Sequence, residues 1–404
     1  MSENPLKPEC LPAESSPSAA ESRRHNYCGW IVLIAALAVR TVYLIQFVQS
    51  PLLRYLRADQ LYYLDWALRI ASGDWLGSKV FEQAPLYPYL LGMAIRVFGD
   101  QPLLFLIVQL VAGAISCCLL YGSGTRLFGR PVGLIAGLLL AVYGPCIFYE
   151  CMVLKSFLSP FLTTVALYGA VRYRDSENRR WLWTAGASVG LACLVRENHV
   201  LLLLPVSVFL LFASQQSERM TRVLFRRRVG AVIQLWVAAA LMLVPSAARN
   251  YQVGQEFVPV TAGGGEVFYL AFGEAARPYY SAPSFVTGNP YLEHEDFRVE
   301  AERRLGRELT RAESSRYWFR EAIHWATRDP ARTVELTWQK AVCLFNDYEV
   351  ADGEDFHVTL RFVSLLKILP TFGWIGGLGF CGAVLCCVRK AGAGGWVVPL
   401  MAAS

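Results

Sequence analysis

The sequence reads RADQLYYLDW at residues 57–66 and FEQAPLYPYL at residues 81–90, shortly after the first long hydrophobic stretch, Trp30–Val48. Asp59 and Glu82 supply carboxylates in these two segments, and several tyrosines surround them. A simple connector between two apolar stretches needs neither an acidic residue close to a membrane span nor a Glu-x-x-Pro segment. The pattern therefore predicts that carboxylates and aromatic rings meet at a membrane surface.

The composition predicts an all-α polytopic membrane protein. Of 404 residues, 54% are hydrophobic and only 17% are charged, and apolar runs approach the ~20 residues that cross a bilayer as a helix. The net charge of +6 could indicate a nucleic-acid partner, but the arginines lie between apolar runs, as topology determinants do. We therefore expect no nucleic acid. The 11 cysteines lack paired spacing, which argues against a zinc site or a disulfide framework.

Eight apolar stretches predict membrane spans: Trp30–Val48, Leu103–Gly122, Val132–Phe148, Phe157–Val171, Trp181–Val195, Val200–Ala213, Val229–Ala247 and Ile368–Val388. The flanking arginines then fall on one side of the membrane, provided that Leu86–Phe98 does not cross. This stretch reaches about 20 Å as a helix, short of the ~30 Å core, which predicts an interfacial helix. A last apolar run, Trp396–Ser404, is also too short to cross, so we expect a truncated or abnormal end.

The positive-inside rule makes the arginine-rich side cytoplasmic. Four regions follow: a disordered cytoplasmic tail (1–26), a transmembrane catalytic module (27–248) with its first outer loop at 49–102, an extracytoplasmic segment (249–359) and a C-terminal transmembrane region (360–404). Asp59, Glu82, Lys155 and Arg196 then lie at the outer mouths of the spans. Charges at such positions are a functional hypothesis by default.

These residues resemble the polyprenyl-phosphate-sugar-dependent glycosyltransferases of GT-C fold, the dolichyl-phosphate-mannose protein mannosyltransferase-like superfamily. The resemblance runs from about Arg40 to Glu349 and includes interfacial helices in the first outer loop and an α-rich outer segment. It rests on Asp59, on Glu82 with Pro85 and Tyr87-Pro88, on LFGR at 127–130, on Tyr149-Glu150 with Leu154-Lys155, on RNY at 249–251, on FVPV at 257–260 and on the glycines at 263–265.

The resemblance implies that one sugar moves from a polyprenyl-phosphate donor to a hydroxyl acceptor outside the cytoplasm, with inversion at the anomeric carbon. The acceptor would be a protein, a glycolipid or a polysaccharide. The protein would be a multi-pass protein of the plasma (inner) membrane, in contact with membrane lipid, and its N-terminus would be cytoplasmic.

Asp59 matches the catalytic aspartate of the family, and a carboxylate can accept the proton of an attacking hydroxyl. A helix N-cap in the outer loop or a solvated loop charge is the alternative. Gln60 follows it where many relatives carry a second acidic residue, which argues against an acidic pair. Glu82 is the second predicted catalytic residue, with a cap for the helix at Leu86 as the alternative. Ala84 replaces the first proline of the family's Pro-Pro segment.

Lys155, Arg196 and Arg249 are predicted to bind the donor phosphate, because cations stabilise the charge of a departing phosphate. Snorkelling to headgroups is the alternative, and an ion pair with Glu150 would also explain Lys155. Predicted substrate contacts come from Tyr62, Tyr63, Tyr87 and Glu150; an interfacial aromatic belt is the alternative for the rings. No ligand set predicts a metal, although a divalent metal stays open.

Three further features carry local predictions. Arg40 interrupts the first span about 12 Å inside its outer end, which predicts an internal partner. The glycines at 263–265 lack the Lys and the strand-to-helix frame of a phosphate loop, so we expect a flexible turn. Thr310 and Glu313 predict a capping box at the start of a helix that carries Trp318.

Two other classes of protein stay open at this stage. A sugar or lipid transporter (a flippase) would also be polytopic, and it would predict inverted repeats, which the sequence does not show. A non-catalytic membrane scaffold is the other alternative. The departures from the family pattern at Gln60 and Ala84, together with the expected abnormal end at Ser404, keep this alternative open.

Overall fold

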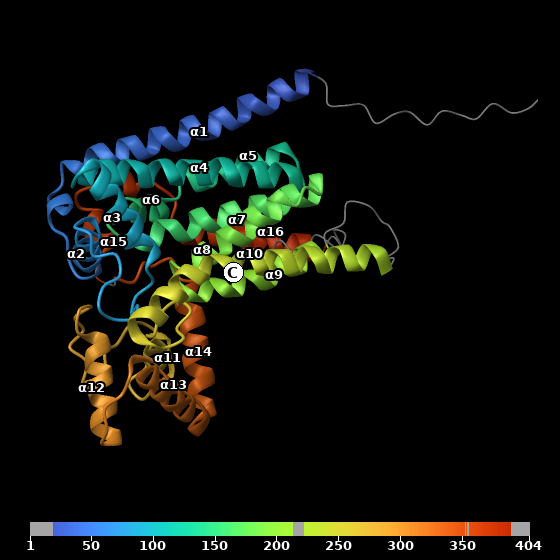
Figure 1. Cartoon of the computed structure of the whole chain (residues 1–404). Coiled ribbons are helices and arrows are strands. Elements are labelled where there is room, and N and C mark those ends of the chain that lie inside the picture. The colour runs from blue at the N-terminus through green and yellow to red at the C-terminus, as the bar shows by residue number, and fades with distance from the viewer. Residues whose placement is uncertain (1–18, 213–221, 352, 354, 389–404) are drawn as a thin grey trace, which may run out of the picture.

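The computed structural model describes residues 19–212, 222–351, 353 and 355–388, and every regular element within them is helical, as predicted. Long helices lie side by side in a bundle, and shorter helices gather at one end of it (Figure 1). The segment that carries α11 to α14 stands against this same end and projects away from the bundle. The short helices and this segment together position the site described below.

The bundle contains α1 (Ala19–Val48), α4 (Pro102–Phe128), α5 (Arg130–Ala141), α6 (Gly144–Glu150), α7 (Leu158–Ser176), α8 (Arg180–Cys193), α9 (Leu203–Phe212), α10 (Arg222–Gly254) and α16 (Phe372–Val388). Within the described residues, α1, α4 and α10 are long and apolar enough to cross a membrane, and the bent pair α5–α6 makes a fourth if it is one span. For α7, α8, α9 and α16 the predicted crossing stays a prediction.

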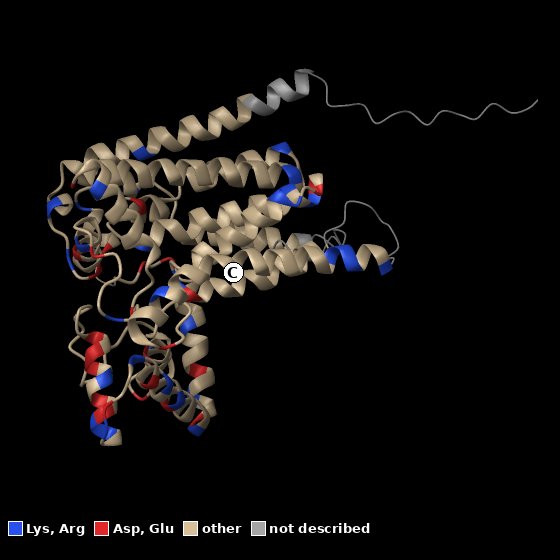
Figure 2. Cartoon of the chain, viewed as in Figure 1, with Lys and Arg blue, Asp and Glu red and all other residues tan. Residues whose placement is uncertain are grey.

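Charged residues gather at the two ends of the bundle and on the projecting segment, and the middle parts of the helices carry few (Figure 2). One end is dominated by arginine, from the termini of α4, α5, α7 and α10. A low-charge band between charged ends is typical of a protein embedded in a bilayer, because hydrocarbon cannot solvate a charge. These features suggest an integral membrane protein.

Several predicted boundaries differ from the observed ones. The chain bends by 52° between α5 and α6, within the stretch Val132–Phe148 that is predicted as one span. Pro145 in the first turn of α6 explains the break, because proline has no N–H that could continue the hydrogen bonds of α5 to the carbonyl oxygen of Ala141. The predicted tail at 1–26 is wrong for residues 19–26, which begin α1, while residues 1–18 and Trp396–Ser404 lie outside the described residues.

The first outer loop folds back on the end of the bundle as two packed helices. They are α2 (Asp59–Ala71) and α3 (Leu86–Phe98), and α3 has the bounds expected for the interfacial helix. A β-carbon on Gly92 would lie 2.8 Å from the carbonyl oxygen of Ala67, so this glycine lets the two helices touch. Tyr63 and Tyr87 are buried in their shared core with Leu158 and Val195.

The projecting segment contains α11 (Gly264–Phe272), α12 (Glu293–Leu305), α13 (Arg311–Arg328) and α14 (Pro330–Leu344), and α15 (Phe356–Thr359) follows beside the bundle. The predicted capping box of Thr310 and Glu313 is confirmed at the start of α13. The flexible turn expected at residues 263–265 is wrong. Gly264 begins α11, and a β-carbon on Gly265 would lie 1.7 Å from the carbonyl oxygen of Ser315, so the glycine brings α11 against α13.

Candidate active site

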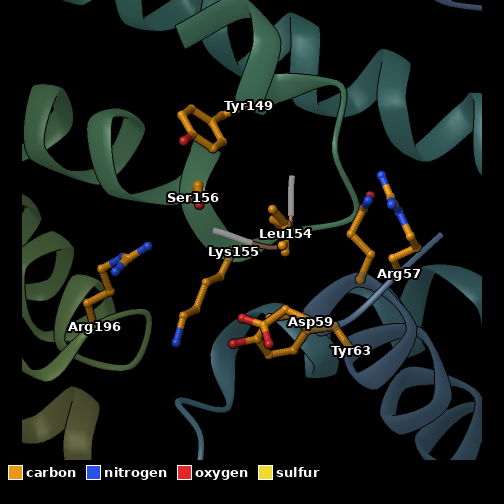
Figure 3. A pocket seen from close by; sticks show the side chains of 10 residues that line it. Arg57, Asp59, Tyr63, Tyr149, Leu154, Lys155, Ser156 and Arg196 are labelled. Atoms are coloured by element: carbon orange, nitrogen blue, oxygen red, sulfur yellow. The ribbon is translucent and has the colours of Figure 1, made fainter. Parts of the chain in front are cut away.

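A cavity of about 310 Å³ opens where the first outer loop meets the connection between α6 and α7 (Figure 3). Its walls are formed by Arg57, Asp59, Gln60, Tyr63, Tyr149, Leu154, Lys155, Ser156, Arg196 and Gly353. Four residues predicted from the sequence are among them: Asp59, Tyr63, Lys155 and Arg196. The chain therefore brings a carboxylate from residue 59 together with cations from residues 155 and 196.

Asp59 is the first residue of α2, the end of a helix at which acidic side chains are favoured. Ala58, just before it, has a φ of +44°, a conformation that non-glycine residues rarely adopt. Such backbone costs about 1–3 kcal/mol and persists only where the surroundings impose it. The strained residue lies between two cavity residues, Arg57 and Asp59. Strained backbone of this kind is typical of functional sites.

The connection that carries Lys155 is held by two buried glutamines. The Oε1 atom of Gln60 accepts a hydrogen bond from the N–H of Val153 (2.8 Å). The Nε2 atom of Gln109, on α4, donates to the carbonyl oxygens of Glu150 (2.8 Å) and Met152 (2.9 Å). Gln60 departs from the family pattern, and here its amide fixes the cavity wall from α2.

Lys155 extends into the cavity from this wall, with Arg196 on one side and Asp59 on the other (Figure 3). Its Nζ atom donates to Oε1 of Gln83 (3.4 Å) and lies 5.7 Å from the centre of the Tyr63 ring. Burial lowers the pKa of Lys155 to about 8; the charge of Arg196 lowers it too, whereas Glu197 and Asp59 act in the opposite direction. This ammonium faces protein groups and a cavity rather than lipid headgroups.

The charges of the cavity walls are mostly positive. Arg57, Lys155 and Arg196 are the three cationic wall residues, and Asp59 supplies the single wall carboxylate. Arg196 precedes the short helical turn Glu197–Leu202, and the Oε1 atom of Glu197 accepts a hydrogen bond from the hydroxyl of Thr261 (2.6 Å), which ties this edge to the projecting segment. Charge-assisted hydrogen bonds from such cations suit a phosphate.

Five predicted site residues do not line the cavity: Tyr62, Glu82, Tyr87, Glu150 and Arg249. Glu82 forms an ion pair with Arg311 of α13 (3.0 Å). No side chain caps α3, so the alternative role of Glu82 as a helix cap is wrong, while its catalytic role stays a prediction. The guanidinium of Arg249 lies 4.0 Å from the centre of the Phe81 ring and donates to the carbonyl oxygen of Lys79 (2.7 Å). Both side chains therefore fasten the loop that carries residues 81–85.

The other three support the walls from behind. The hydroxyl of buried Tyr87 donates to Oε1 of Gln109 (3.0 Å). The ring of Tyr62 packs edge-on against those of Tyr63 and Tyr291. The carboxylate of Glu150 binds Arg40, so the ion pair with Lys155 that the spacing allowed is wrong.

Other residues of the site carried no role in the sequence analysis: Arg57, Gln83, Gln109, Tyr149 and Ser156. Arg57 stands two residues before Asp59 and Gln83 directly after Glu82, so proximity to the predicted carboxylates was a usable signal for both. Gln109 reaches the site from the middle of an apolar stretch, where an isolated polar residue was also a signal. The sequence left a divalent metal as an open possibility. Among the described residues, no group of three or more His, Cys, Asp or Glu side chains is arranged to hold a metal ion.

The sequence of residues 82–247 matches the family model described as dolichyl-phosphate-mannose-protein mannosyltransferase. This segment includes the wall residues Tyr149, Lys155 and Arg196 but not Asp59. No curated protein matches the chain.

Solved structures of an oligosaccharyltransferase from Archaeoglobus fulgidus are similar to the chain. The complex with zinc and sulfate has a TM-score of 0.54 at 13% identity, over 92% of this chain and 45% of that one. The form tethered to an acceptor peptide with an NVT sequon has a TM-score of 0.53 at 15% identity, over 94% and 46%. The chain thus spans less than half the length of these proteins. The likeness shows the fold, an all-helical arrangement of GT-C type.

Proposed function

We propose that the chain is a membrane glycosyltransferase that moves a single sugar from a polyprenyl-phosphate donor to a hydroxyl group on the extracytoplasmic face. The family-model match and the GT-C fold support the general class, a glycosyl-transfer enzyme. The observation that carries the finer proposal is the cavity in which Asp59 meets Lys155 and Arg196. A proton acceptor and a phosphate-binding pair are the two parts that the reaction needs.

Asp59 acts as the base of the transfer. The acceptor oxygen attacks the anomeric carbon while the Asp59 carboxylate takes its proton. The bond from the anomeric carbon to the phosphate oxygen breaks, and the phosphate leaves with the bonding electrons. Because the attack comes from the face opposite the leaving group, the configuration inverts. Phosphate is a good leaving group, so no general acid is required.

Lys155 and Arg196 bind the phosphate and stabilise the charge that develops on it. Arg57, on the same cavity wall as Asp59, adds a third cation. The volume of about 310 Å³ is at the small end of the ~300–1,000 Å³ range of ligand pockets, which supports a single sugar rather than an oligosaccharide. Tyr63 and Tyr149 are the aromatic wall residues, and of the two only Tyr149 is partly exposed and can face the sugar ring without rearrangement.

The acceptor is a protein hydroxyl, a glycolipid or a polysaccharide. The arginine-rich end of the bundle supports a cytoplasmic position for the termini of α4 and α10 at that end, and thus an extracytoplasmic cavity. The protein then lies in the plasma (inner) membrane with its N-terminus in the cytoplasm. The donor reaches the cavity from the surrounding lipid.

The test compares the wild-type chain with Asp59→Asn in liposomes that contain a panel of polyprenyl-phosphate sugars and a membrane extract as acceptor. Release of polyprenyl phosphate is measured. Asp65→Asn is the matched control, since Asp65 lies on α2 but binds the hydroxyl of Tyr291 outside the cavity. We expect release by wild type and Asp65→Asn, and a loss of about 10²–10⁴-fold in Asp59→Asn.

Equal release by wild type and Asp59→Asn would remove Asp59 from the chemistry. Release by neither protein, for any sugar of the panel, would contradict the proposed donor class. If the same liposomes then take up a donor in a way that depends on an ion gradient, this would support a transporter. If they show no such uptake, this would support a scaffold.

A further inference from the structure

Gln83 connects two walls of the cavity without lining it. Its Oε1 atom accepts a hydrogen bond from the hydroxyl of Tyr63, on α2 (3.1 Å). The same atom accepts one from the ammonium of Lys155, on the α6–α7 connection (3.4 Å). Tyr63 and Lys155 both line the cavity. One amide oxygen therefore sets the relative position of two side chains that lie far apart in the sequence.

The backbone beneath Gln83 is fixed on both sides. The N–H of Phe81 donates to Oδ1 of Asn250 (3.0 Å), and the N–H of Ala262 donates to the carbonyl oxygen of Phe81 (2.8 Å). Beyond Gln83, the N–H of Leu86 donates to the carbonyl oxygen of Leu194 (3.0 Å). The amide thus extends from a segment anchored to α10, the projecting segment and α8, and a fixed acceptor can hold a flexible lysine.

The neutrality of this amide matters for an anion site. A lysine ammonium has three N–H donors, so a single bond to Gln83 leaves two for a ligand. A carboxylate at this position would neutralise the ammonium and compete with a bound phosphate. The charged groups that face Lys155 are Arg196 and Glu197, from the turn after α8, and Asp59, from α2. Gln83 orients the cation among them and adds no charge.

We propose that Gln83 is a positioning residue of the anion site, whose neutral amide oxygen aims the Lys155 ammonium into the cavity and holds the buried Tyr63 ring in the cavity wall. The proposal deepens the proposed function and rests on it for the identity of the anion, the phosphate of the donor. The geometric part, that Gln83 sets the environment of Lys155, can be tested without any substrate.

The substrate-free test measures the reactivity of Lys155 toward acetic anhydride as a function of pH, read by peptide mass spectrometry of the reconstituted chain. Gln83→Leu removes the acceptor, so we expect the titration midpoint of Lys155 to move to lower pH. Gln83→Glu adds a nearby carboxylate of almost the same shape, so we expect the midpoint to rise by about one unit. Lys79, in the same outer loop, serves as the internal control and keeps its midpoint. An unchanged Lys155 midpoint in both variants would overturn the proposal.

The kinetic test uses the release assay with these two variants and Gln101→Leu, a control at an exposed glutamine of the same loop. Gln83→Leu should raise the donor KM roughly tenfold, the effect of one hydrogen bond to a charged group, with a smaller change in kcat. Gln83→Glu should move the alkaline limb of the pH profile upward. If wild type is active and both variants keep its donor KM and pH profile, Gln83 has no positioning role and the proposed function is unaffected. If wild type is inactive, the proposed function fails and the labelling result decides on Gln83 alone.

Discussion

Arg40 and Glu150, 110 residues apart in the sequence, form two hydrogen bonds of 2.7 Å inside the bundle, from Nε and Nη2 of the guanidinium to the two carboxylate oxygens. Their side chains are 2% and 5% exposed. Arg40 also donates to the carbonyl oxygen of Ala141 (3.3 Å), the last residue of α5, where the helix breaks before α6. The internal partner predicted for Arg40 is confirmed, and the pair fastens α6 and the following cavity wall to α1.

Replacement of Arg40 by methionine should destabilise the protein by about 3–5 kcal/mol, because it leaves the Glu150 carboxylate buried without its partner. Glu150→Met should have a similar effect, through the guanidinium left behind. Thermal unfolding in detergent, followed by circular dichroism, measures both. Arg54→Met, at an exposed position in the same region of the chain, is the control and should unfold like wild type.

The double variant, with both residues replaced by methionine, should lose less stability than the sum of the two single variants, since neither charge is then left buried alone. Strictly additive losses would show that Arg40 and Glu150 do not interact in the detergent-solubilised protein.

Gly113→Ala should also destabilise the protein. A β-carbon on this residue of α4 would lie 2.1 Å from Oε1 of Glu150, so the carboxylate would have to leave Arg40. A loss of stability in this variant would be informative, because alanine ordinarily stabilises a helix interior by about 1 kcal/mol relative to glycine. Gly230→Ala on α10, with no atom within 4 Å of the new β-carbon, is the control and should be neutral or stabilising. A stable Gly113→Ala variant would contradict the close packing of α4 on the ion pair.

The release of polyprenyl phosphate should fall as the pH rises through about 8. Burial and the charge of Arg196 lower the pKa of Lys155 to about 8, so the ammonium that binds the donor phosphate is lost above that pH. The measurement is the pH dependence of kcat/KM for the donor in liposomes. Lys155→Arg keeps its charge throughout this range, because an arginine guanidinium does not deprotonate in proteins. Its profile should lack the alkaline fall, and an identical fall in this variant would assign the titration to another group.

The sequence allowed several charged residues of this site to be predicted, but it did not allow their contacts to be predicted. Lys155 and Arg196 could be found because each is a charge at the end of an apolar stretch, and such charges are costly unless they have a function. Asp59 could be found because it matches the catalytic aspartate that the resemblance implies. Glu82 also matches an acidic position that the resemblance implies, yet it binds Arg311, 229 positions further along the chain. Nothing in a linear pattern distinguishes a carboxylate that lines a cavity from one that pairs with a distant helix.

The glutamines illustrate the second limit. Gln60 was interpreted only as a departure from an acidic residue, although its amide oxygen holds the backbone at Val153. An amide that accepts from backbone has no sequence signature, since its partner can lie anywhere in the chain. The flexible turn predicted at the glycines 263–265 fails for a similar reason, because the contact that these glycines make has no signature in the sequence. Their role, the close approach of α11 to α13, depends on Ser315, which only the tertiary fold brings near.

The projecting segment should lose stability as the pH rises through the neutral range. The ring of His294 on α12 hydrogen-bonds the carboxylate of Glu266 on α11, and both side chains are buried. Burial lowers the pKa of His294, but the hydrogen bond and the charge of Glu266 outweigh it and raise the pKa overall. Burial raises the pKa of Glu266, although His294 and Arg311 act against it. Each group therefore holds its proton to a higher pH in the folded protein than in the unfolded chain.

A raised pKa in the folded state has a fixed consequence for stability. The stabilisation that protonated His294 contributes is complete below its unfolded pKa of about 6.5, and it is lost as the pH rises through the higher folded pKa. The stabilisation from protonated Glu266 is likewise complete below its unfolded pKa of about 4.5 and is lost as the pH rises above that value. Thermal unfolding between pH 5 and pH 9 measures the trend. His294→Gln, which keeps an N–H donor for Glu266, should flatten it above about pH 6.5. His324→Gln changes an exposed histidine of α13 and should retain the slope of wild type. A slope that survives His294→Gln would show that other groups cause the pH dependence.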